Sequence, residues 1–357
     1  MLTAALKPLF ASDWLAPLND ASAVDDVLGQ INPLWTVRSI KARVVEIRQE
    51  TADARTFVLQ PNRHWHGFKA GQHVVIDLEL DGVRHQRSYS LSSSPSDRET
   101  IAITVKRQPD GKVSNALHDR VKVGDVLGLS APAGSFVMNG AHSAPYLMIS
   151  AGSGITPVMS MLRELHARND QRDIFFLHVC RTPEDAIFAG DLHAIAASMP
   201  GLQLHFHYTA ENGRLPLDAL AILVPDYAQR DTFLCGPAAF MADMKAKWSQ
   251  VGLESKLACE HFGVAPVASG ASATVEIRAA RSERVFTAST AQPLLVEAES
   301  AGLKPRHGCR IGICQSCKCR KTSGTVQNLL TGEISSEPNQ MIQLCVSAAR
   351  SDVHLEI

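Results

Sequence analysis

Hydrophobic and polar positions alternate along residues 40–138 in short runs that are typical of β-strands. Runs such as "GQHVVIDLEL" and "ETIAITVKR" are rich in Val, Ile and Thr, and turn dipeptides such as Asp81-Gly82 separate them. Six or so strands at this spacing predict a small antiparallel barrel.

From about Pro145 the pattern changes to apolar runs that alternate with amphipathic segments. "APYLMISAGSG" has the pattern of a buried strand that runs into a glycine turn, and "TPVMSMLRELHAR" has that of an amphipathic helix. The same alternation continues through "DIFFLHVCR", "LQLHFHYT", "DTFLCGP" and "LACEHF". This order predicts a doubly wound parallel sheet with helices on both faces.

The two ends of the chain follow other patterns. Leu2, Leu6, Leu9 and Phe10 stand at helical spacing in an N-terminal extension, for which a cap packed on the main body is favoured over a docking surface for a partner or a membrane. "GVAPVASGASA" has the small, uncharged residues of a linker. After it come a hairpin pattern, a short helix, a cysteine-rich loop and closing strands. The expected divisions are 1–38 (extension), 39–140 (barrel), 141–263 (α/β domain), 264–272 (linker) and 273–357 (last domain).

Composition narrows the functional classes. Hydrophobic residues make up 45% and charged residues 20% of the 357, which is ordinary for globular domains, and the net charge of −1 argues against a nucleic-acid binder. No run of about eighteen apolar residues exists. The N-terminus lacks the basic start of a signal peptide, so a cytoplasmic location with reduced cysteines is expected.

Four of the eight cysteines lie in "CRIGICQSCKCR", residues 309–320. Cys309, Cys314 and Cys317 have the spacing C-x4-C-x2-C, and Cys345 follows 28 positions after Cys317. This is the plant-type pattern of four thiolates that hold a [2Fe–2S] cluster. Glycines nearby would let the backbone wrap closely around the cluster.

Zinc on Cys309, Cys314, Cys317 and Cys319 is the alternative metal site. Structural zinc sites usually bring two short ligand pairs that a longer stretch separates, and this loop fits that arrangement less well. An iron–sulfur cluster is therefore favoured over zinc, and Cys319 is not expected to be a ligand.

Three short motifs then stand in a defined order: "RSYS" at 87–90, "GSGITP" at 152–157 and "LCGP" at 234–237. Followed by the cysteine pattern, they resemble the ferredoxin–NADP reductase superfamily. The whole chain from about residue 40 resembles flavin and iron–sulfur reductases that supply electrons to oxygenases, hydroxylases and desaturases. The resemblance implies a six-stranded antiparallel flavin-binding β-barrel, a doubly wound NAD(P)-binding domain and a C-terminal β-grasp ferredoxin domain.

The resemblance also implies roles for the flavin site. Arg87 would bind a flavin phosphate, Tyr89 would lie against the isoalloxazine ring, and Ser90 would hydrogen-bond near N5, the atom that accepts hydride. A second segment would bring backbone N–H groups and a hydroxyl to a pyrophosphate, which favours FAD over FMN. The flavin-binding residues implied are Arg87, Ser88, Tyr89, Ser90, Gly111, Lys112, Val113 and Ser114.

For the nicotinamide site, the resemblance implies that the glycine turn lets the backbone approach a pyrophosphate. Cys235 would lie near nicotinamide C4 in a positioning role, and Phe262 would stack on the flavin, with Glu260 as a weaker member of the site. The residues implied are Gly152, Gly154, Thr156, Arg181, Cys235, Gly236, Pro237 and Phe262. Glu211, Arg214 and Arg181 are placed to sense a 2′-phosphate, and the donor stays open between NADPH and NADH, with a slight preference for NADPH.

One feature departs from the family pattern, because Gln315 stands where these cluster loops often carry glycine after the second cysteine. The resemblance implies electron flow from NAD(P)H through FAD and [2Fe–2S] to a redox partner: an oxygenase, a hydroxylase, a fatty-acid desaturase or a P450. The alternatives are an FMN reductase of a ring-hydroxylating dioxygenase and, less favoured, a redox sensor without turnover. A monomer is expected, with peripheral contact to a membrane-bound partner left open.

Overall fold

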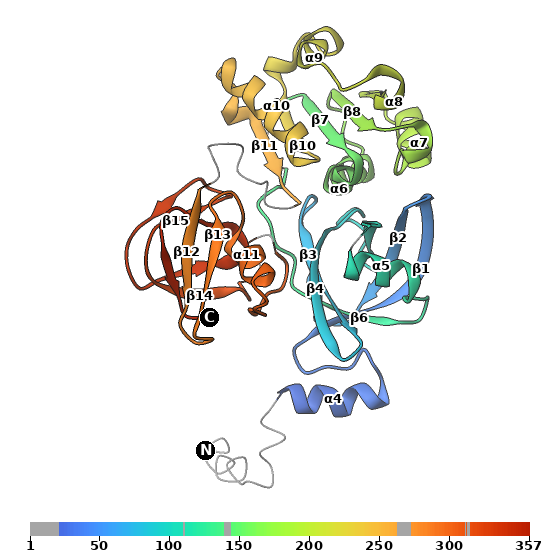
Figure 1. Ribbon diagram of the computed structural model, residues 1–357. Helices are drawn as coiled ribbons and strands as arrows, with labels where there is room; N and C mark the ends of the chain where they lie inside the picture. Colours follow the sequence, from blue (N-terminus) through green and yellow to red (C-terminus); the bar gives the residue numbers. More distant parts are fainter. Residues whose placement is uncertain (1–20, 110, 139–143, 263–272, 311, 313–314) are drawn as a thin grey trace, which may run out of the picture.

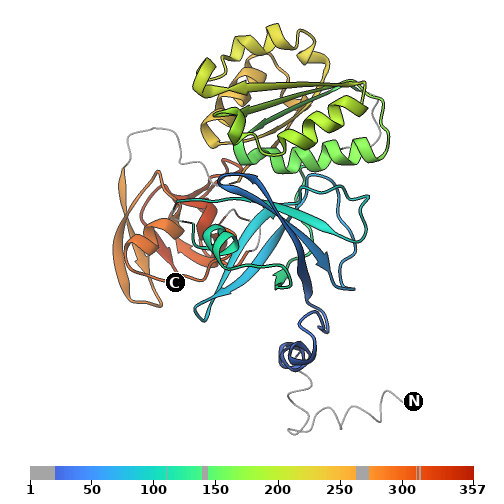
Figure 2. The same cartoon turned by 90° about the vertical axis from the view of Figure 1, so that its right-hand side faces the viewer.

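The computed structural model describes residues 21–109, 111–138, 144–262, 273–310, 312 and 315–357. The described chain forms a barrel, a parallel sheet above it and a third domain beside it (Figures 1 and 2). Most of the predicted N-terminal segment and the whole linker 264–272 lie outside the described residues.

Helix α4 (Ala21–Ile31) extends away from the barrel near the N-terminus (Figure 1). Its Val27 and Ile31 are 61% and 70% exposed, and Trp35, which follows the helix, is 52% exposed. Leu2, Leu6, Leu9 and Phe10, on which the expected cap rests, lie outside the described residues, so the cap stays a prediction. Asn62 anchors the chain beyond the helix by donating to the carbonyl of Leu34.

The first domain is the predicted six-stranded antiparallel barrel. Its strands run in the order β4-β3-β6-β1-β2-β5, and a bridge between Leu91 and Ile103 joins the two outer strands. The strands are β1 (Ile40–Thr51), β2 (Ala54–Pro61), β3 (His73–Leu80), β4 (Val83–Ser90), β5 (Ile101–Lys106) and β6 (Val126–Leu129). Helix α5 (Lys112–Asp119) buries Val113 and Leu117 in the barrel core.

The second domain is the predicted doubly wound sheet, with all strands parallel in the order β11-β10-β7-β8-β9. The strands are β7 (Tyr146–Ala151), β8 (Ile174–Cys180), β9 (Leu202–Tyr208), β10 (Asp231–Cys235) and β11 (Leu257–Glu260). The helices are α6 (Ile155–Ala167), α7 (Ala189–Ser198), α8 (Thr209–Asn212), α9 (Leu217–Leu223) and α10 (Ala238–Gln250).

Side chains of β7 alternate between two cores, one on each face of this sheet. Tyr146 and Met148 belong to the core that α6 and α7 cover, whereas Leu147 and Ile149 belong to the core that contains Trp248 of α10. A strand buried on both faces explains the continuous apolar run in the sequence.

The third domain has two small sheets and one helix, α11 (Leu294–Ser300). The larger sheet has the order β13-β12-β19-β14-β17 and the smaller β16-β15-β18. The strands are β12 (Thr274–Ala279), β13 (Arg284–Ser289), β14 (Lys318–Ser323), β15 (Val326–Asn328), β16 (Ile334–Ser335), β17 (Gln340–Gln343), β18 (Ser347–Ala349) and β19 (Val353–Leu355). Leu294 and Leu295 of α11 enter the same core as Cys317 and Cys345.

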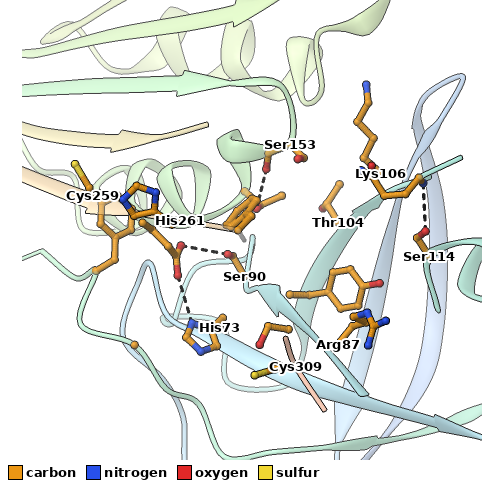
Figure 3. A pocket seen from close by; sticks show the side chains of 18 of the residues that line it. His73, Arg87, Ser90, Thr104, Lys106, Ser114, Ser153, Cys259, His261 and Cys309 are labelled. Carbon is orange, nitrogen blue, oxygen red and sulfur yellow. Dashed lines mark hydrogen bonds and ion pairs between the residues drawn. The ribbon is translucent and has the colours of Figure 1, made fainter. Parts of the chain in front are cut away.

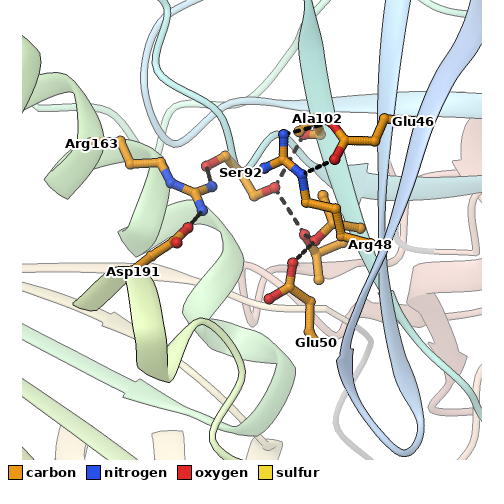
Figure 4. Close-up of polar contacts among 9 residues, drawn as sticks. Glu46, Arg48, Glu50, Ser92, Ala102, Arg163 and Asp191 are labelled. Carbon is orange, nitrogen blue, oxygen red and sulfur yellow. Dashed lines mark hydrogen bonds and ion pairs between the residues drawn. The ribbon is translucent and has the colours of Figure 1, made fainter. Parts of the chain in front are cut away.

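A dense polar contact joins the barrel to the parallel sheet. Glu164 of α6 accepts hydrogen bonds from the hydroxyls of Ser94 and Ser96. Arg163 donates to the carbonyl of Ser92 and pairs with Asp191, as Figure 4 shows. The loop after β4 is thereby held against the start of the second domain. Among the described residues, no helix is long and apolar enough to cross a membrane.

Candidate functional site

A cavity of about 850 Å³ lies where the three domains meet. The end of β4, strand β5 and the start of α5 line it from the barrel, and Ser153, Thr156 and the segment after β11 line it from the second domain (Figure 3). Cys309 and Leu330 reach it from the third domain. The site therefore brings together most of the regions that the motifs marked.

All four residues of "RSYS" line the cavity at the end of β4. Burial raises the pKa of Tyr89, so this phenol is neutral. Burial also lowers the pKa of Arg87, whose hydrogen bonds among the described residues go to the backbone carbonyls of Gln86 and Gly308. The hydroxyl of Ser88 is buried and has no hydrogen-bond partner among the described residues. Buried polar groups of this kind normally have partners, so they fit a polar ligand in the cavity.

Ser90 belongs to a chain of side chains that crosses between two domains. Its hydroxyl donates to Glu260 Oε2 over 3.3 Å, and Glu260 Oε1 lies 3.3 Å from Nδ1 of His73. The side chains of His73 and Glu260 are only 6% and 11% exposed. Glu260, at the end of β11, therefore contacts two other residues of the site, whereas the sequence indicated only a weak contribution.

The start of α5 forms the far wall of the cavity. Gly111, Val113 and Ser114 line it, whereas Lys112 is not part of the lining. A Cβ at Gly111 would lie 2.3 Å from the Ser114 hydroxyl oxygen and 2.8 Å from Gln108 Cβ, so a side chain there would crowd this turn. The cavity therefore continues from "RSYS" to a helix start, which is the space that a flavin with a second phosphate needs.

The glycine turn and "LCGP" pack against each other at the carboxyl ends of β7 and β10. Gly152 has φ +53, and a Cβ on Gly154 would lie 2.3 Å from the carbonyl oxygen of Cys235. Glycine at 154 is thus required by the neighbouring backbone itself. Thr156 donates to the carbonyl of Ser153 and lines the cavity, as a residue that fixes the turn would.

Cys235 is fully buried, and burial, followed by the charge of Glu260, raises the pKa of its thiol well above the usual value. Such a thiol is neutral and poorly nucleophilic. Gly236 and Pro237 follow it at the start of α10. Phe262 is 42% exposed and lines the cavity, so an aromatic face is available to a ligand.

The residues suggested for a 2′-phosphate lie apart from this cavity. Arg181 follows β8 and is exposed. Arg214 is already paired with Asp243 at 2.8 Å. Glu211 was expected in a loop after β9, and in the structure it lies in the short helix α8.

In the third domain, Cys309, Cys317 and Cys345 are all buried, and the sulfurs of Cys317 and Cys345 are 3.2 Å apart. Cys314 lies outside the described residues. Gly312 and Gln315, which are described residues of this loop, have φ +82 and +59, so both stand in left-handed backbone positions. The departure at Gln315 therefore occupies a left-handed backbone position that glycine adopts more easily.

Cys319 differs from these three residues because it belongs to strand β14. Burial raises the pKa of its thiol to about 12. Among the described residues, the predicted ligands Cys317 and Cys345 have their sulfurs in contact, as two thiolates of one cluster would, whereas no group of three or more candidate ligands is gathered there.

Three domain families match successive parts of the chain, one for each of its three domains. They are described as an oxidoreductase FAD-binding domain (residues 41–138), an oxidoreductase NAD-binding domain (148–246) and a 2Fe-2S iron-sulfur cluster binding domain (277–350). An "NADPH oxidoreductase" of Mycobacterium tuberculosis is 40% identical over 93% of this chain and 88% of its own length.

The chain belongs to the ferredoxin–NADP reductase superfamily with a C-terminal [2Fe–2S] domain. It is an NAD(P)H-dependent oxidoreductase, and FAD, NAD(P)H and a [2Fe–2S] cluster are its cofactors. The recognition, the fold class and the cofactors predicted from the sequence are thereby confirmed.

Other relatives match this reductase over most of their length. The glycine betaine monooxygenase reductase subunit of Chromohalobacter salexigens is 35% identical over 90% of this chain and 96% of its own. The solved phthalate dioxygenase reductase matches with a TM-score of 0.62 at 23% identity, over 89% of this chain and 97% of its own. At 23% identity, this similarity supports the fold alone.

Sequence reasoning missed several residues that line the cavity of this reductase. They include His73, Thr104, Lys106, Lys245 and His261. No pattern marked His73, because it stands on the face of β3 opposite the barrel-core residues Val74 and Ile76. Lys245 and His261 hydrogen-bond each other at the rim, and no local pattern distinguishes them from surface residues.

Proposed function

We propose that this reductase takes hydride from NADPH at the three-domain cavity and supplies single electrons to a partner oxygenase. The observation that carries the proposal is the cavity itself, because it joins "RSYS", the segment after β11 and the cluster ligand Cys309 in one space. Bound FAD supplies the conversion of hydride into single electrons, and the [2Fe–2S] cluster passes them on.

Arg87 binds a flavin phosphate in this proposal, and Tyr89 lies along the isoalloxazine ring. Support comes from their place in the cavity and from the hydrogen bonds of Arg87, which among the described residues go to backbone carbonyls. A guanidinium suits a phosphate because its planar fork donates two parallel hydrogen bonds. Ser88 adds a hydroxyl, since its oxygen has no other described partner.

The start of α5 holds the second phosphate of FAD. Gly111 and Ser114 line the cavity, and the first N–H groups of an α-helix point toward an anion placed there. Lys112 and Val113 complete the turn. FMN would leave this wall of the cavity without a ligand.

Ser90 hydrogen-bonds at N5, where hydride arrives, and Glu260 orients it. Gly152, Gly154 and Thr156 hold the dinucleotide at the start of α6, and Cys235, Gly236 and Pro237 place the nicotinamide. The buried, neutral thiol of Cys235 supports a positioning role. Phe262 would offer its exposed ring to the bound flavin.

The 2′-phosphate of NADPH is bound by Arg181. Its guanidinium is exposed at the carboxyl end of β8, whereas Arg214 is already paired with Asp243. Open parallel sheets bind ligands at these strand ends. The name of the mycobacterial relative agrees with NADPH as donor.

Cys309, Cys314, Cys317 and Cys345 hold the cluster, and the acceptor is a terminal oxygenase. The glycine betaine monooxygenase reductase subunits, of similar length to this chain, support that partner class. The reductase acts as a monomer and meets its partner in solution or at a membrane surface.

The test is the visible absorption spectrum of the anaerobic protein before and after NADPH, with NADH added to a separate sample. Flavin and iron–sulfur bands that both bleach, faster with NADPH, are the expected result. A flavin spectrum with bound zinc and no cluster bands would overturn the electron path. Faster bleaching with NADH would overturn the role of Arg181.

A further inference from the structure

A chain of hydroxyl groups runs from the wall of the cavity to the surface of the barrel. It begins at Thr104 of β5, which lines the cavity, and Oγ1 of Thr104 lies 2.8 Å from Oγ1 of Thr56 on β2. The Thr56 hydroxyl donates over 2.6 Å to Oε1 of Glu50, which is partly exposed near the end of β1. Thr56 and Thr104 are only 2% and 5% exposed. Figure 4 shows Glu50 at one end of these contacts and Ser92 at the other.

The hydrogen bonds of this chain point in one direction, toward the carboxylate. A hydroxyl has a single proton, and Thr56 gives its proton to Glu50, so Thr104 is the donor in the bond between the two threonines. Ser92 Oγ lies 3.0 Å from Thr104 Oγ1 and can donate to it or to the carbonyl of Ala102. Hydroxyls that are lined up in this way and end on a carboxylate can pass a proton outward.

The inner end of the chain stands beside Ser90. Leu91 and Ile103 form an antiparallel bridge, and both side chains enter the barrel core. Side chains alternate along a strand, so the neighbouring Ser90 and Thr104 face away from that core, at the same end of the bridge. Both line the cavity. The hydroxyl chain therefore starts next to the serine that is proposed to contact flavin N5.

The proposed reaction needs a proton exit at this point. NADPH yields NADP⁺, two electrons and one proton, and the cluster accepts electrons alone. For each NADPH, the N–H bond at flavin N5 must therefore break and its proton must leave the cavity. On the other side of Ser90, the contacts through Glu260 end at His73, whose Nε2 is buried and has no hydrogen-bond partner among the described residues. That branch shows no further step toward the surface.

We propose that Thr104, Thr56 and Glu50 form the proton exit of the hydride-transfer site. This inference rests on the proposed function, since it places flavin N5 near Ser90. As the electrons of the N5–H bond pass to the cluster, the proton moves to the Thr104 oxygen. Thr104 gives its own proton to Thr56, and Thr56 gives its proton to the Glu50 carboxylate, which releases it to water. Thr104 contacts the reacting atom, whereas Thr56 and Glu50 position it and carry the proton onward.

The first experiment follows the holoprotein by stopped flow, with one equivalent of NADPH and with ferricytochrome c as the electron acceptor. Flavin absorbance measures hydride arrival, and a pH-indicator dye in weak buffer measures proton release. Thr104→Val removes the hydroxyl at nearly constant volume. We expect it to lower the ratio of the proton-release rate to the flavin-reduction rate by about tenfold or more, because positioned acid–base groups typically contribute about 10²–10⁴-fold. Thr104→Ser, which returns the hydroxyl, should restore most of that ratio.

Two glutamates of β1 provide a matched pair for the outer end of the chain. Glu50→Gln removes the carboxylate on which the chain ends. Glu46→Gln removes a carboxylate of the same strand that pairs with Arg48 and is half exposed. We expect proton release to slow in the Glu50 variant and to stay unchanged in the Glu46 variant. Equal rates in the two variants would contradict the role of Glu50.

A measurement without flavin tests the chain itself. Denaturant unfolding of the flavin-free protein, with its cluster intact, compares Thr56→Val, Thr104→Val and the double variant. Residues that hydrogen-bond each other are coupled, so we expect the double variant to lose less stability than the sum of the two single losses. Additive losses would mean that the two hydroxyls do not bond each other, and the inference would fail.

Unchanged proton release in Thr104→Val would also overturn the inference, and slow release in Glu260→Gln alone would assign the exit to the other branch. Failure of the proposed function would be distinct from these results, because NADPH would then leave the flavin of the unchanged protein oxidised.

Discussion

Replacing His73 with leucine tests whether this histidine orients the acid of the hydride-transfer site. His73 and Glu260 come from different domains, and Nδ1 lies 3.3 Å from Oε1 of the carboxylate. The other carboxylate oxygen accepts from Ser90. Leucine has a similar volume and no polar atom, so Glu260 would keep a single hydrogen bond in a site that is nearly closed to water.

The expected cost follows from this geometry. Loss of one hydrogen bond to a charged group costs about 1.5–3 kcal/mol. For a unit of the size of the barrel with its parallel sheet, a loss near 2 kcal/mol lowers the melting temperature by roughly 4–8 °C. A carboxylate that can rotate away from Ser90 also disturbs hydride transfer, for which we expect a loss of about tenfold in rate.

Stopped-flow flavin reduction by NADPH and a thermal melt of the FAD-loaded protein measure the two effects. His73→Asn is the matched control, because the side-chain amide of asparagine can donate from near the position of Nδ1. We expect this variant to retain most of the rate and of the melting temperature. If the leucine variant reduces its flavin as fast as the unchanged protein and melts at the same temperature, another group orients Glu260 and the reasoning fails.

Three further predictions follow from the site and the core. Cys345→Ser should abolish the cluster absorption bands and cytochrome c reduction, while flavin reduction by NADPH persists. Cys319→Ser should retain the cluster. Equal loss of the cluster in both variants would contradict the ligand assignment. Arg181→Gln should raise the KM for NADPH by roughly tenfold and leave that for NADH unchanged, because it removes a charged hydrogen bond to phosphate, and Arg214→Gln is its control. Burial lowers the pKa of His178 to about 4, so the unfolded chain binds the proton first as the pH falls, and stability decreases between about pH 6.5 and 4. In the His178→Gln variant, the melting temperature should depend less on pH between about pH 6.5 and 4. An unchanged slope would mean that other groups cause this pH dependence.

Sequence patterns predicted the three domains because each depends on local periodicity or on a short motif. The β alternation, the buried strand before the glycine turn and the cysteine spacing all lie within a few dozen residues. The same locality explains why "RSYS" and the start of α5 were found as cavity walls. The roles of their individual side chains stay predictions until the cofactors are seen in place.

Contacts between distant segments could not be predicted in the same way. His73 meets Glu260 across 187 positions, and Arg87 meets Gly308 across 221. Gly154 shows the same limit, because the sequence explained it by approach to a pyrophosphate, whereas in the folded chain the backbone of Cys235 also leaves no room for a Cβ at this position. Each of these reasons depends on how two domains or two strands meet, and the local pattern contains no information on that.

The two joints around the cavity differ in the way that their chemistry requires. Hydride transfer needs the reacting atoms held about 3–3.5 Å apart, and the joint between the barrel and the parallel sheet is correspondingly rich in hydrogen bonds, with Glu164 buried among serine hydroxyls. The joint to the cluster domain includes the hydrogen bond from Arg87 to the Gly308 carbonyl, which joins residues 221 positions apart. Electrons pass without a shared bond, so this second joint needs less exact geometry than the hydride site does.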